Sequence, residues 1–186
     1  MPVHATTPTP TRERLLDCAE ELFAKAPYDT VSVRAICAAA DANVAAVHYH
    51  FGTKEDLVVA LLGDRLVPRW ATALESLTPG APVPELVDAV LHPFTRIQSE
   101  ELGRTHLRLL SRLVADAPQT QWPGGWTSLR QWGGTLPHLD AKTARARWAL
   151  AFDLILTTFG RADHRPLSPD EIAALRAFVI AGLASP

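Results

Sequence analysis

The chain has few cysteines, no long apolar run and little excess of charge of either sign. Its two cysteines are too few for a disulfide framework, and they lack the CxxC spacing of a redox pair. Cys18 and Cys37 lie in apolar helical patterns, so we expect buried, unreactive thiols. No segment approaches the ~18 apolar residues that cross a bilayer, and the opening MPVHATTPTPTRER lacks the apolar core of a secretory signal. These absences predict a cytoplasmic protein with no membrane partner.

The charge balance does not by itself indicate a nucleic-acid partner. The 186 residues contain 18 Lys and Arg against 20 Asp and Glu, which gives a net charge of −2 with neutral histidine. Residues 1–56 hold five basic and eight acidic side chains, a net charge of −3, and the remainder carries +1. Because neutralisation of phosphates usually supplies much of the affinity for DNA, any contact with DNA must come from a few well-placed groups.

Helical periodicity is present along most of the chain. Apolar residues recur at spacings of three and four, and no stretch alternates with period two for long enough to form a sheet. The composition, 47% hydrophobic and 20% charged, is typical of a folded globular chain. We therefore predict an all-α fold with one or two domains.

The first 52 residues predict three short helices in close succession. The first helix begins between Thr9 and Arg12 and ends at Pro27. Ser32 can cap the second helix, and Asn43 can cap the third. Two short helices joined by a tight turn are the helix-turn-helix pattern.

A larger helical region follows. Gly52 is predicted to end the third helix in a left-handed conformation, the T-x-x-D sequence at Thr53 opens a fourth helix, and Pro68 predicts a kink or break in it. Further helices are predicted at about 84–98, 102–116, 141–159 and 168–183, while the Trp- and Gly-rich segment 118–134 is ambiguous, with helix around 127–132. The predicted organisation is a helix-turn-helix domain over residues 1–52, with residues 1–8 disordered, and a larger helical domain over 53–186.

The residues around the tight turn match a family pattern. They include LFA at 22–24, SVRAI at 32–36, ADA at 40–42 and VHYHFGTKEDL at 47–57. On these motifs, the stretch 15–62 resembles the N-terminal DNA-binding domain of the TetR-type (TetR/AcrR) transcriptional repressors. Two positions depart from the family pattern: Asp41 replaces the usual turn glycine, and Cys37-Ala38 replaces alanine and a charged residue. Asp tolerates the left-handed conformation better than most residues, so we expect the turn to be kept.

The resemblance implies a DNA-binding surface on the second and third helices. Ser32, Asn43 and Thr53 begin successive helices, whose free N–H groups can bind phosphate oxygens. Arg34 and Lys54 add positive charge. Small apolar side chains on the third helix let it lie deep in a DNA groove. His48 is the best candidate for a hydrogen bond to a base edge. The predicted contact residues are Ser32, Val33, Arg34, Asn43, Val44, Ala45, Ala46, His48, Tyr49, His50, Thr53 and Lys54. Two alternatives stay open: Val44 and Val47 belong mostly to the core, and His50 packs against the first helix.

The rest of the chain has no comparable motif, and the resemblance implies that it binds a small inducer and dimerises through its last two helices. An apolar pocket is predicted to be lined by Phe94, His106, Leu110, Trp126, Trp148 and Phe152. Alternatively, these aromatic residues are only core. Excess apolar surface predicts a four-helix bundle with a second copy of the chain, through Leu150, Leu154, Leu175, Phe178, Val179 and Leu183. The sequence does not decide whether Trp148 and Phe152 serve the pocket or the interface.

Two other classes of function are less well supported. An enzyme would need a nucleophile with its base, a phosphate loop or a metal cluster, and no such motif is found. Asp88 and His92 share a helix face, but one such pair is weak evidence, so no metal and no cofactor are expected. A helical interaction module that binds no DNA is disfavoured by the HYHFGTKE segment. The sequence thus predicts a ligand-responsive transcriptional regulator, by the resemblance a repressor, that binds a pseudo-palindromic operator as a homodimer and is released by a small-molecule effector.

Overall fold

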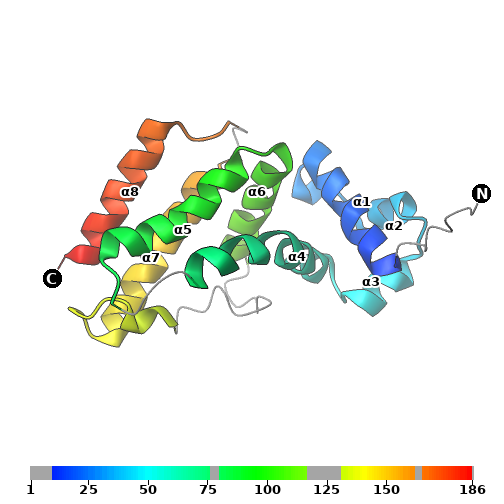
Figure 1. Cartoon of the computed structure of the whole chain (residues 1–186). Coiled ribbons are helices and arrows are strands. Elements are labelled where there is room, and N and C mark those ends of the chain that lie inside the picture. Colours follow the sequence, from blue (N-terminus) through cyan, green and yellow to red (C-terminus); the bar gives the residue numbers. More distant parts are fainter. Residues whose placement is uncertain (1–9, 76–79, 117–130, 162–164, 186) are drawn as a thin grey trace, which may run out of the picture. The chain divides into compact units, whose positions relative to one another are not determined.

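The computed structural model describes residues 10–75, 80–116, 131–161 and 165–185. Within these ranges all regular structure is helical, which confirms the predicted fold class (Figure 1). The chain divides after Leu61 into two compact units. This division falls inside one long helix, α4 (Lys54–Glu75). The boundary predicted from the sequence, between residues 52 and 53, lies earlier, just before α4 begins. The prediction for residues 1–8 lies outside the described residues.

The N-terminal unit is built from short helices around one apolar core. It contains α1 (Thr11–Lys25), the 3₁₀ turn η1 (Tyr28–Thr30), α2 (Val33–Ala39), α3 (Val44–His50) and the first turns of α4. The first three α-helices pack against one another in all three pairs. The core side chains, each at most 3% exposed, are Leu15, Leu16, Ala19, Phe23, Ile36, Cys37, Val47, Leu57, Val58 and Leu61. Because helices this short are marginal alone in water, the shared core is what stabilises them.

Positive φ angles mark the turns before and after α3. Asp41 has a φ of +47°, and it is the one residue other than glycine with positive φ in the described part of the chain. The Ala42 N–H donates to the Cys37 carbonyl at 2.9 Å, which closes the turn around Asp41. Gly52 has a φ of +91°. Asp41 therefore keeps the turn in place of glycine, and Gly52 ends α3, both as predicted.

The two cysteines differ in burial. Cys37 is 3% exposed, and its sulfur lies 3.5 Å from the carbonyl oxygen of Asn43, whereas Cys18 is only half-buried. Burial raises the pKa of both thiols, and the carboxylates of Glu21 and Asp17 raise that of Cys18 further. Both thiols are thus held in the protonated, less nucleophilic form.

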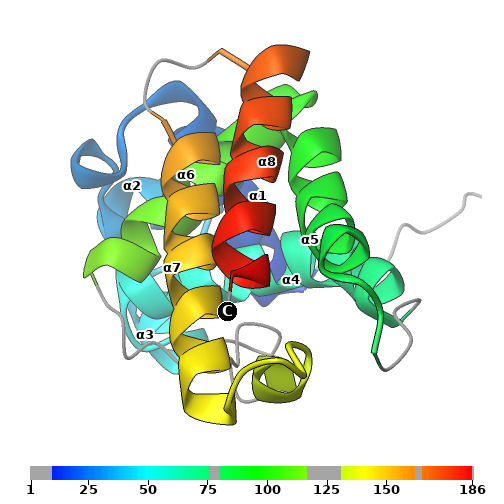
Figure 2. The same ribbon diagram turned by 90° about the vertical axis from the view of Figure 1, so that its left-hand side faces the viewer.

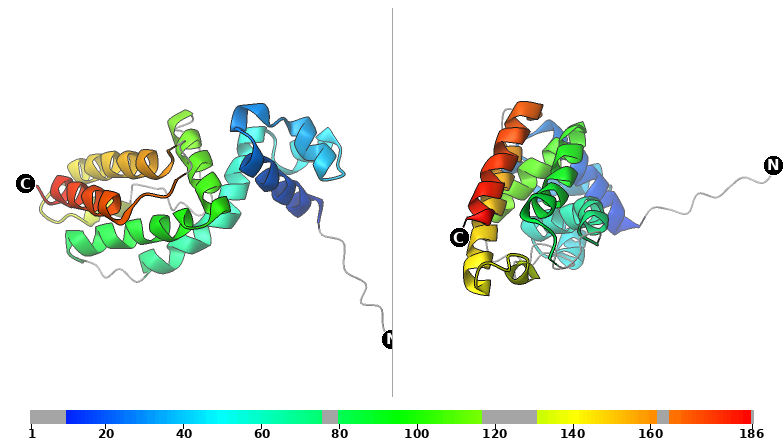
Figure 3. Two further views of the ribbon diagram at one scale, coloured as in Figure 1. Left: turned by 90° about the horizontal axis from the view of Figure 1, so that it is seen from above. Right: turned by 60° about the vertical axis from the view of Figure 1, so that its left-hand side comes forward.

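The C-terminal unit is a packed bundle of longer helices. It contains the remainder of α4, α5 (Val83–Gln98), α6 (Glu101–Asp116), the 3₁₀ turn η3 (Gln131–Gly134), α7 (Ala141–Phe159) and α8 (Pro169–Ala184). α7 and α8 lie side by side and run in opposite directions, and α5 packs against α8 (Figure 2; Figure 3). α6 contacts both α5 and α7. None of the described helices is long and apolar enough to span a membrane.

Of the two outcomes predicted at Pro68, a kink or a break, the break does not occur, because α4 continues through this residue. Pro68 is exposed, while Leu66 and Trp70 on either side of it are 0% and 3% exposed. A proline inside a helix costs about 3 kcal/mol. Burial of each neighbour contributes about 1.5–3 kcal/mol, so tertiary packing offsets the local cost.

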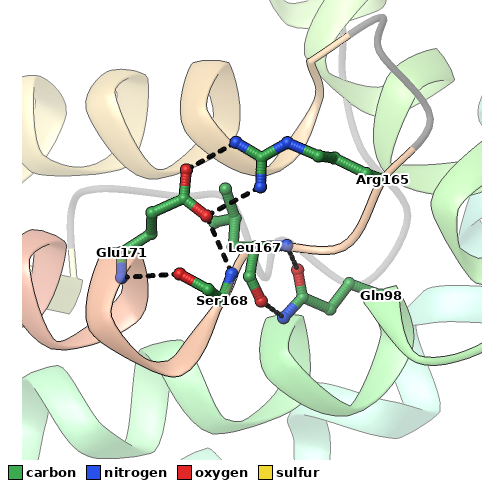
Figure 4. Close-up of polar contacts among 5 residues, drawn as sticks. All are labelled: Gln98, Arg165, Leu167, Ser168 and Glu171. Carbon is green, nitrogen blue, oxygen red and sulfur yellow. Dashed lines mark hydrogen bonds and ion pairs between the residues drawn. The ribbon is translucent and has the colours of Figure 1, made fainter.

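A polar cluster anchors the start of α8 (Figure 4). The buried Gln98 side chain of α5 accepts a hydrogen bond from the Leu167 N–H at 2.8 Å and donates one to the Leu167 carbonyl at 3.3 Å. Ser168 and Glu171 form a reciprocal capping box, and Arg165 donates two hydrogen bonds of 2.9 and 2.7 Å to the Glu171 carboxylate. These bonds, first of all those from Arg165, lower the pKa of Glu171 from 4.5 to about 2. The cluster therefore fixes where α8 begins on α5.

Candidate nucleic-acid interface

Side-chain caps begin the helices of the helix-turn-helix motif, as predicted. The Ser32 hydroxyl accepts a hydrogen bond from the Ala35 N–H at 3.1 Å, and the Asn43 side-chain oxygen accepts one from the Ala46 N–H at 2.9 Å. At α4, the Asp56 N–H donates to the Thr53 hydroxyl at 3.0 Å, and the Thr53 N–H donates to the Asp56 carboxylate at 3.2 Å. The caps fix the starts of α2, α3 and α4, and with them the side chains that follow.

The predicted contact residues lie on the surface of the N-terminal unit. All of them are exposed except Val33, Ala46 and Lys54, which are half-buried. On α3, Val47 is fully buried, while Val44 is 37% and Tyr49 85% exposed. The alternative that these valines belong to the core therefore holds for Val47 but not for Val44. α3 thus turns one apolar side inward and presents the opposite side to the solvent.

His50 is exposed, and its ring contacts are with its own neighbours in the chain. The ring centroid lies 5.0 Å from that of Tyr49 in an edge-to-face arrangement and 6.1 Å from that of Phe51. The alternative in which His50 packs against the first helix finds no support in these contacts. His50 and Tyr49 form an aromatic pair on the surface at the end of α3.

The orientation of the His48 ring is set by the backbone. Its Nδ1 lies 2.8 Å from the carbonyl oxygen of Gly52, the residue that ends α3 with positive φ. The side chain is exposed and stands one helical turn after Val44 on the same side of α3. His48 is therefore held by one ring nitrogen while the other points away from that bond.

The basic side chains of this unit differ in how much they are used within the protein. Arg12 lies 5.6 Å from the centre of the Phe51 ring, Arg14 donates to the Ala40 carbonyl at 3.3 Å, and Lys25 lies 3.8 Å from Glu21. Arg34 is exposed on α2 and has no hydrogen-bond or ion-pair partner among the described residues. Its guanidinium is thus available for a partner outside the chain.

Lys54 is engaged by the protein itself. Its Nζ donates to the Tyr28 carbonyl at 2.6 Å and lies 3.8 Å from the centre of the Tyr28 ring. The Tyr28 hydroxyl in turn donates to Glu55 at 3.0 Å, and the Tyr28 ring stacks on Phe23. Lys54 therefore ties the start of α4 to η1. Sequence reasoning missed Tyr28, because it lies 26 residues from Lys54 and no local spacing connects the two.

The predicted pocket residues of the C-terminal unit fall into separate aromatic clusters. The Phe94 ring lies 4.8 Å from that of Trp70 and 5.2 Å from that of Phe159. Trp148 and Phe152 instead lie beside Trp132, with ring centroids 4.5 and 5.4 Å from that of Trp132. Trp132 was not among the predicted pocket residues. Four of the predicted pocket residues are at most 3% exposed: Phe94, His106, Leu110 and Trp148. Phe152 is half-buried. Trp126 lies outside the described residues. These contacts favour the alternative that Phe94 and Trp148 are core residues.

The predicted dimer residues are of two kinds. Leu150 of α7 and Phe178 of α8 are each 70% exposed, and Leu154 is half-buried. The prediction is corrected for the others: Leu175, Val179 and Leu183 are 7%, 3% and 1% exposed, because they point into the chain's own core. They have too little free surface to contact a second copy, so Leu150 and Phe178 are the members that stand out from the surface.

The Asp88 side chain is used in an ion pair with α8. Its carboxylate accepts two hydrogen bonds from Arg176, at 2.5 and 2.7 Å, and these lower the pKa of Asp88. In the described ranges no three His, Cys, Asp or Glu side chains gather where they could hold a metal ion.

Comparisons with known proteins agree with this geometry. The family model described as "Bacterial regulatory proteins, tetR family" matches residues 15–61, which include most of α1, all of α2 and α3, and the first turns of α4. The HTH-type transcriptional regulator UidR of Escherichia coli is 26% identical over 105 residues, which are 55% of this chain and 50% of that protein. The matched part of the chain thus spans about half the length of the curated relatives.

Solved structures share the fold over nearly the whole chain. NalD of Pseudomonas aeruginosa, described as the secondary repressor of the MexAB-OprM multidrug efflux pump, is 22% identical with a TM-score of 0.66, over 93% of this chain and 96% of that one. Salmonella enterica GusR is 20% identical with a TM-score of 0.57, over 98% and 100% of the two chains. The capped helix-turn-helix and the match of its residues to the family model agree, so residues 15–61 form a domain of the tetR family of bacterial regulatory proteins, and the solved structures share the fold of the chain.

Proposed function

We propose that the protein is a ligand-responsive transcriptional repressor that binds a pseudo-palindromic operator as a homodimer and is released by a small-molecule effector. The observation that carries this proposal is the exposed side of α3, where Val44, His48 and Tyr49 stand outward over the buried Val47. A helix that is capped, short and exposed along one side fits the major groove of B-DNA. Arg34, exposed on the preceding helix, supplies charge for the phosphates beside that groove.

The predicted contacts divide into reading and positioning groups. Small side chains at Val44, Ala45 and Ala46 bring α3 close to the base edges, where they can touch thymine methyl groups. Positioning falls to Arg34, to hydrogen-bonding side chains at the edge of the motif and to free N–H groups in the first turns of the helices. These contact residues are Ser32, Val33, Asn43, Tyr49, His50, Thr53 and Lys54. Since Lys54 is partly used by Tyr28, Arg34 carries the larger share of the electrostatic attraction.

The proposed dimer forms through α7 and α8. These helices lie antiparallel, and they expose Leu150 and Phe178 although both side chains are large and apolar. The exposed positions beside Phe178 on α8 include Ala174, Ala177 and Ala181, which leave room for close approach. Two helices from each copy make a four-helix bundle, and its two-fold symmetry matches the symmetry of a pseudo-palindrome.

The effector is proposed to bind in the C-terminal unit. The half-buried Phe152, in contact with Trp132 and Trp148, offers an apolar wall for a small molecule. In one conformation of the dimer the spacing of the two recognition helices fits DNA, and in another it does not. An effector that binds the second conformation more tightly shifts the population toward it, and the DNA is released.

The proposal is tested by selecting bound duplexes from a random DNA pool with the full chain. We expect an enriched sequence with two related half-sites about one helical turn, ~34 Å, apart. Light scattering of the complex then gives its stoichiometry, and compounds are screened for release of the selected duplex. Failure to enrich any sequence contradicts DNA reading, and a 20 kDa species at micromolar concentration contradicts the dimer.

A further inference from the structure

The hydrogen bond between His48 and Gly52 decides which ring nitrogen of His48 carries the proton. The Nδ1 atom lies 2.8 Å from the Gly52 carbonyl oxygen, and a carbonyl oxygen can only accept. Nδ1 is therefore the donor. A neutral imidazole has a single N–H, so its other nitrogen, Nε2, is left as a hydrogen-bond acceptor.

The backbone holds this arrangement in place. The Gly52 N–H donates to the Val47 and His48 carbonyls, both at 3.1 Å, so the chain folds back over the end of α3. The Gly52 carbonyl is thereby brought to the ring of His48. The ring is pinned to the last turn of α3 rather than left to rotate in the solvent.

The remaining ring nitrogen is available outside the chain. His48 is exposed and makes no second hydrogen bond or ion pair with the residues that the structure describes. Val44 and Ala45, exposed in the preceding turn of α3, have no polar side-chain atoms, and the polar side chains of Tyr49 and His50 follow at the end of the helix. His48 thus presents a single acceptor atom beside an apolar surface.

We infer that His48 selects a base that offers a hydrogen-bond donor in the major groove, which means the exocyclic amine of cytosine or adenine. This inference rests on the proposed DNA-binding function. Guanine presents N7 and O6, and thymine presents O4, and all three atoms are acceptors. An acceptor on the protein facing an acceptor on the base leaves both without a partner, so these two bases are rejected at the contacted position.

Two variants of His48 separate reading from support. In His48→Asn, the side-chain amide N–H takes the place of Nδ1 and can donate to Gly52, but no atom reaches the position of Nε2. In His48→Gln, the amide reaches outward and can both donate and accept, so it no longer distinguishes the two kinds of base edge. Thermal unfolding of each variant shows whether the fold is retained.

The experiment begins with selection from a random duplex pool at about pH 8, where free imidazole is neutral. The wild-type chain is expected to show one position in each half-site with cytosine or adenine, and His48→Asn is expected to lose the preference at that position alone. The amine is then removed by placing 2-pyrimidinone for cytosine or purine for adenine. We expect the wild type to lose about tenfold in affinity.

The asparagine variant also controls for damage to the duplex itself. Removal of the amine weakens base pairing in the duplex, whichever protein is bound to it. The informative value is therefore the loss of affinity for the wild type divided by the loss of affinity for His48→Asn. A ratio near one overturns the inference, and so does guanine or thymine at the His48-dependent position. If no duplex is enriched by the wild type, the proposed function fails instead, so the two failures are distinguishable.

Discussion

The two compact units use their polar side chains in different ways. In the N-terminal unit, the bonds of the exposed side chains of Ser32, Asn43, His48 and Thr53 join residues three or four positions apart, whereas the cations Arg14 and Lys54 reach carbonyls 26 residues away. In the C-terminal unit, the Gln98 side chain reaches Leu167 across 69 residues. There, too, Asp88 meets Arg176 across 88 residues, and Arg69 meets Glu100 across 31. Local bonds set the ends of short helices and leave their exposed sides for a partner, whereas long-range bonds hold whole helices together.

Placing charges on the exposed face of α7 and α8 has the largest expected effect on dimerisation and DNA binding. The double change Leu150→Glu with Phe178→Glu places charges where two apolar side chains are 70% exposed, so it disrupts the proposed dimer without entering the core. Because the second half-site contact adds about 10²–10⁴ in affinity, operator binding falls by at least about 100-fold. Light scattering and fluorescence anisotropy measure the two effects. Ala141→Glu, exposed in the first turn of α7, is the control and should leave both unchanged.

Removing the Gln98 side chain tests the long-range bonds of the C-terminal unit. Gln98→Ala leaves the N–H and carbonyl of Leu167 without their side-chain partner in a buried site, which costs about 1–3 kcal/mol of unfolding free energy. Urea unfolding of the full chain measures this loss. The neighbouring exposed change Ser99→Ala should cost much less. Equal losses for the two variants would show that the Gln98 bonds do not stabilise α8.

Arg34 and Lys54 are expected to separate DNA binding from stability. Arg34→Gln should weaken binding to all sequences and lower the salt slope by about 1, with little change in Tm, because the guanidinium is unpaired among the described residues. Lys54→Gln should lower the free energy of unfolding by about 0.5–2 kcal/mol, since it removes the ammonium from the Tyr28 ring. Salt titrations of DNA binding and thermal melts of both variants measure these two effects. A pure loss of DNA affinity for Lys54→Gln, with its Tm unchanged, would assign the two cations the same role.

The smallest effect is expected from the acid dependence of the α8 cap. The pKa of Glu171 is lowered to about 2 in the folded chain, below its ordinary value of 4.5. A lowered carboxyl pKa contributes stability that is present above pH 4.5 and is lost as the pH falls toward about 2. The Tm of Glu171→Gln should therefore fall less than that of the wild type between neutral pH and about pH 3. An identical decline for both proteins would contradict a role for this carboxylate.

Much of the N-terminal unit could be predicted because its signals are local. The caps at Ser32 and Asn43 and the positive φ at Asp41 and Gly52 each depend on a few neighbouring residues. The exposed position of His48 follows from helical spacing, but its bond to the Gly52 carbonyl required the folded turn. The role of Lys54 could not be predicted, since its partner Tyr28 comes from another element.

The C-terminal unit was predictable in its helices but not in the direction of its side chains. Leu175, Val179 and Leu183 were predicted in the dimer interface, and they are buried within the chain, where α8 packs against α5 and α7. Phe94 and Trp148 were predicted to share a pocket, and they lie in separate aromatic clusters. An apolar stripe indicates that one face of a helix is buried, but it does not indicate which neighbouring helix covers that face.

The sequence by itself determined that the chain is helical, where its first helices begin and end, and which short helix exposes the residues that we propose to read DNA. These properties depend on periodicity, caps and turn residues, all of which act within a few positions. Only the tertiary structure decided that α4 continues through Pro68, that Lys54 is held by Tyr28 while Arg34 is left for a partner, and that Leu150 and Phe178 remain exposed. These outcomes depend on contacts between residues far apart in the chain, and the packing energy of such contacts is large enough to override a local preference.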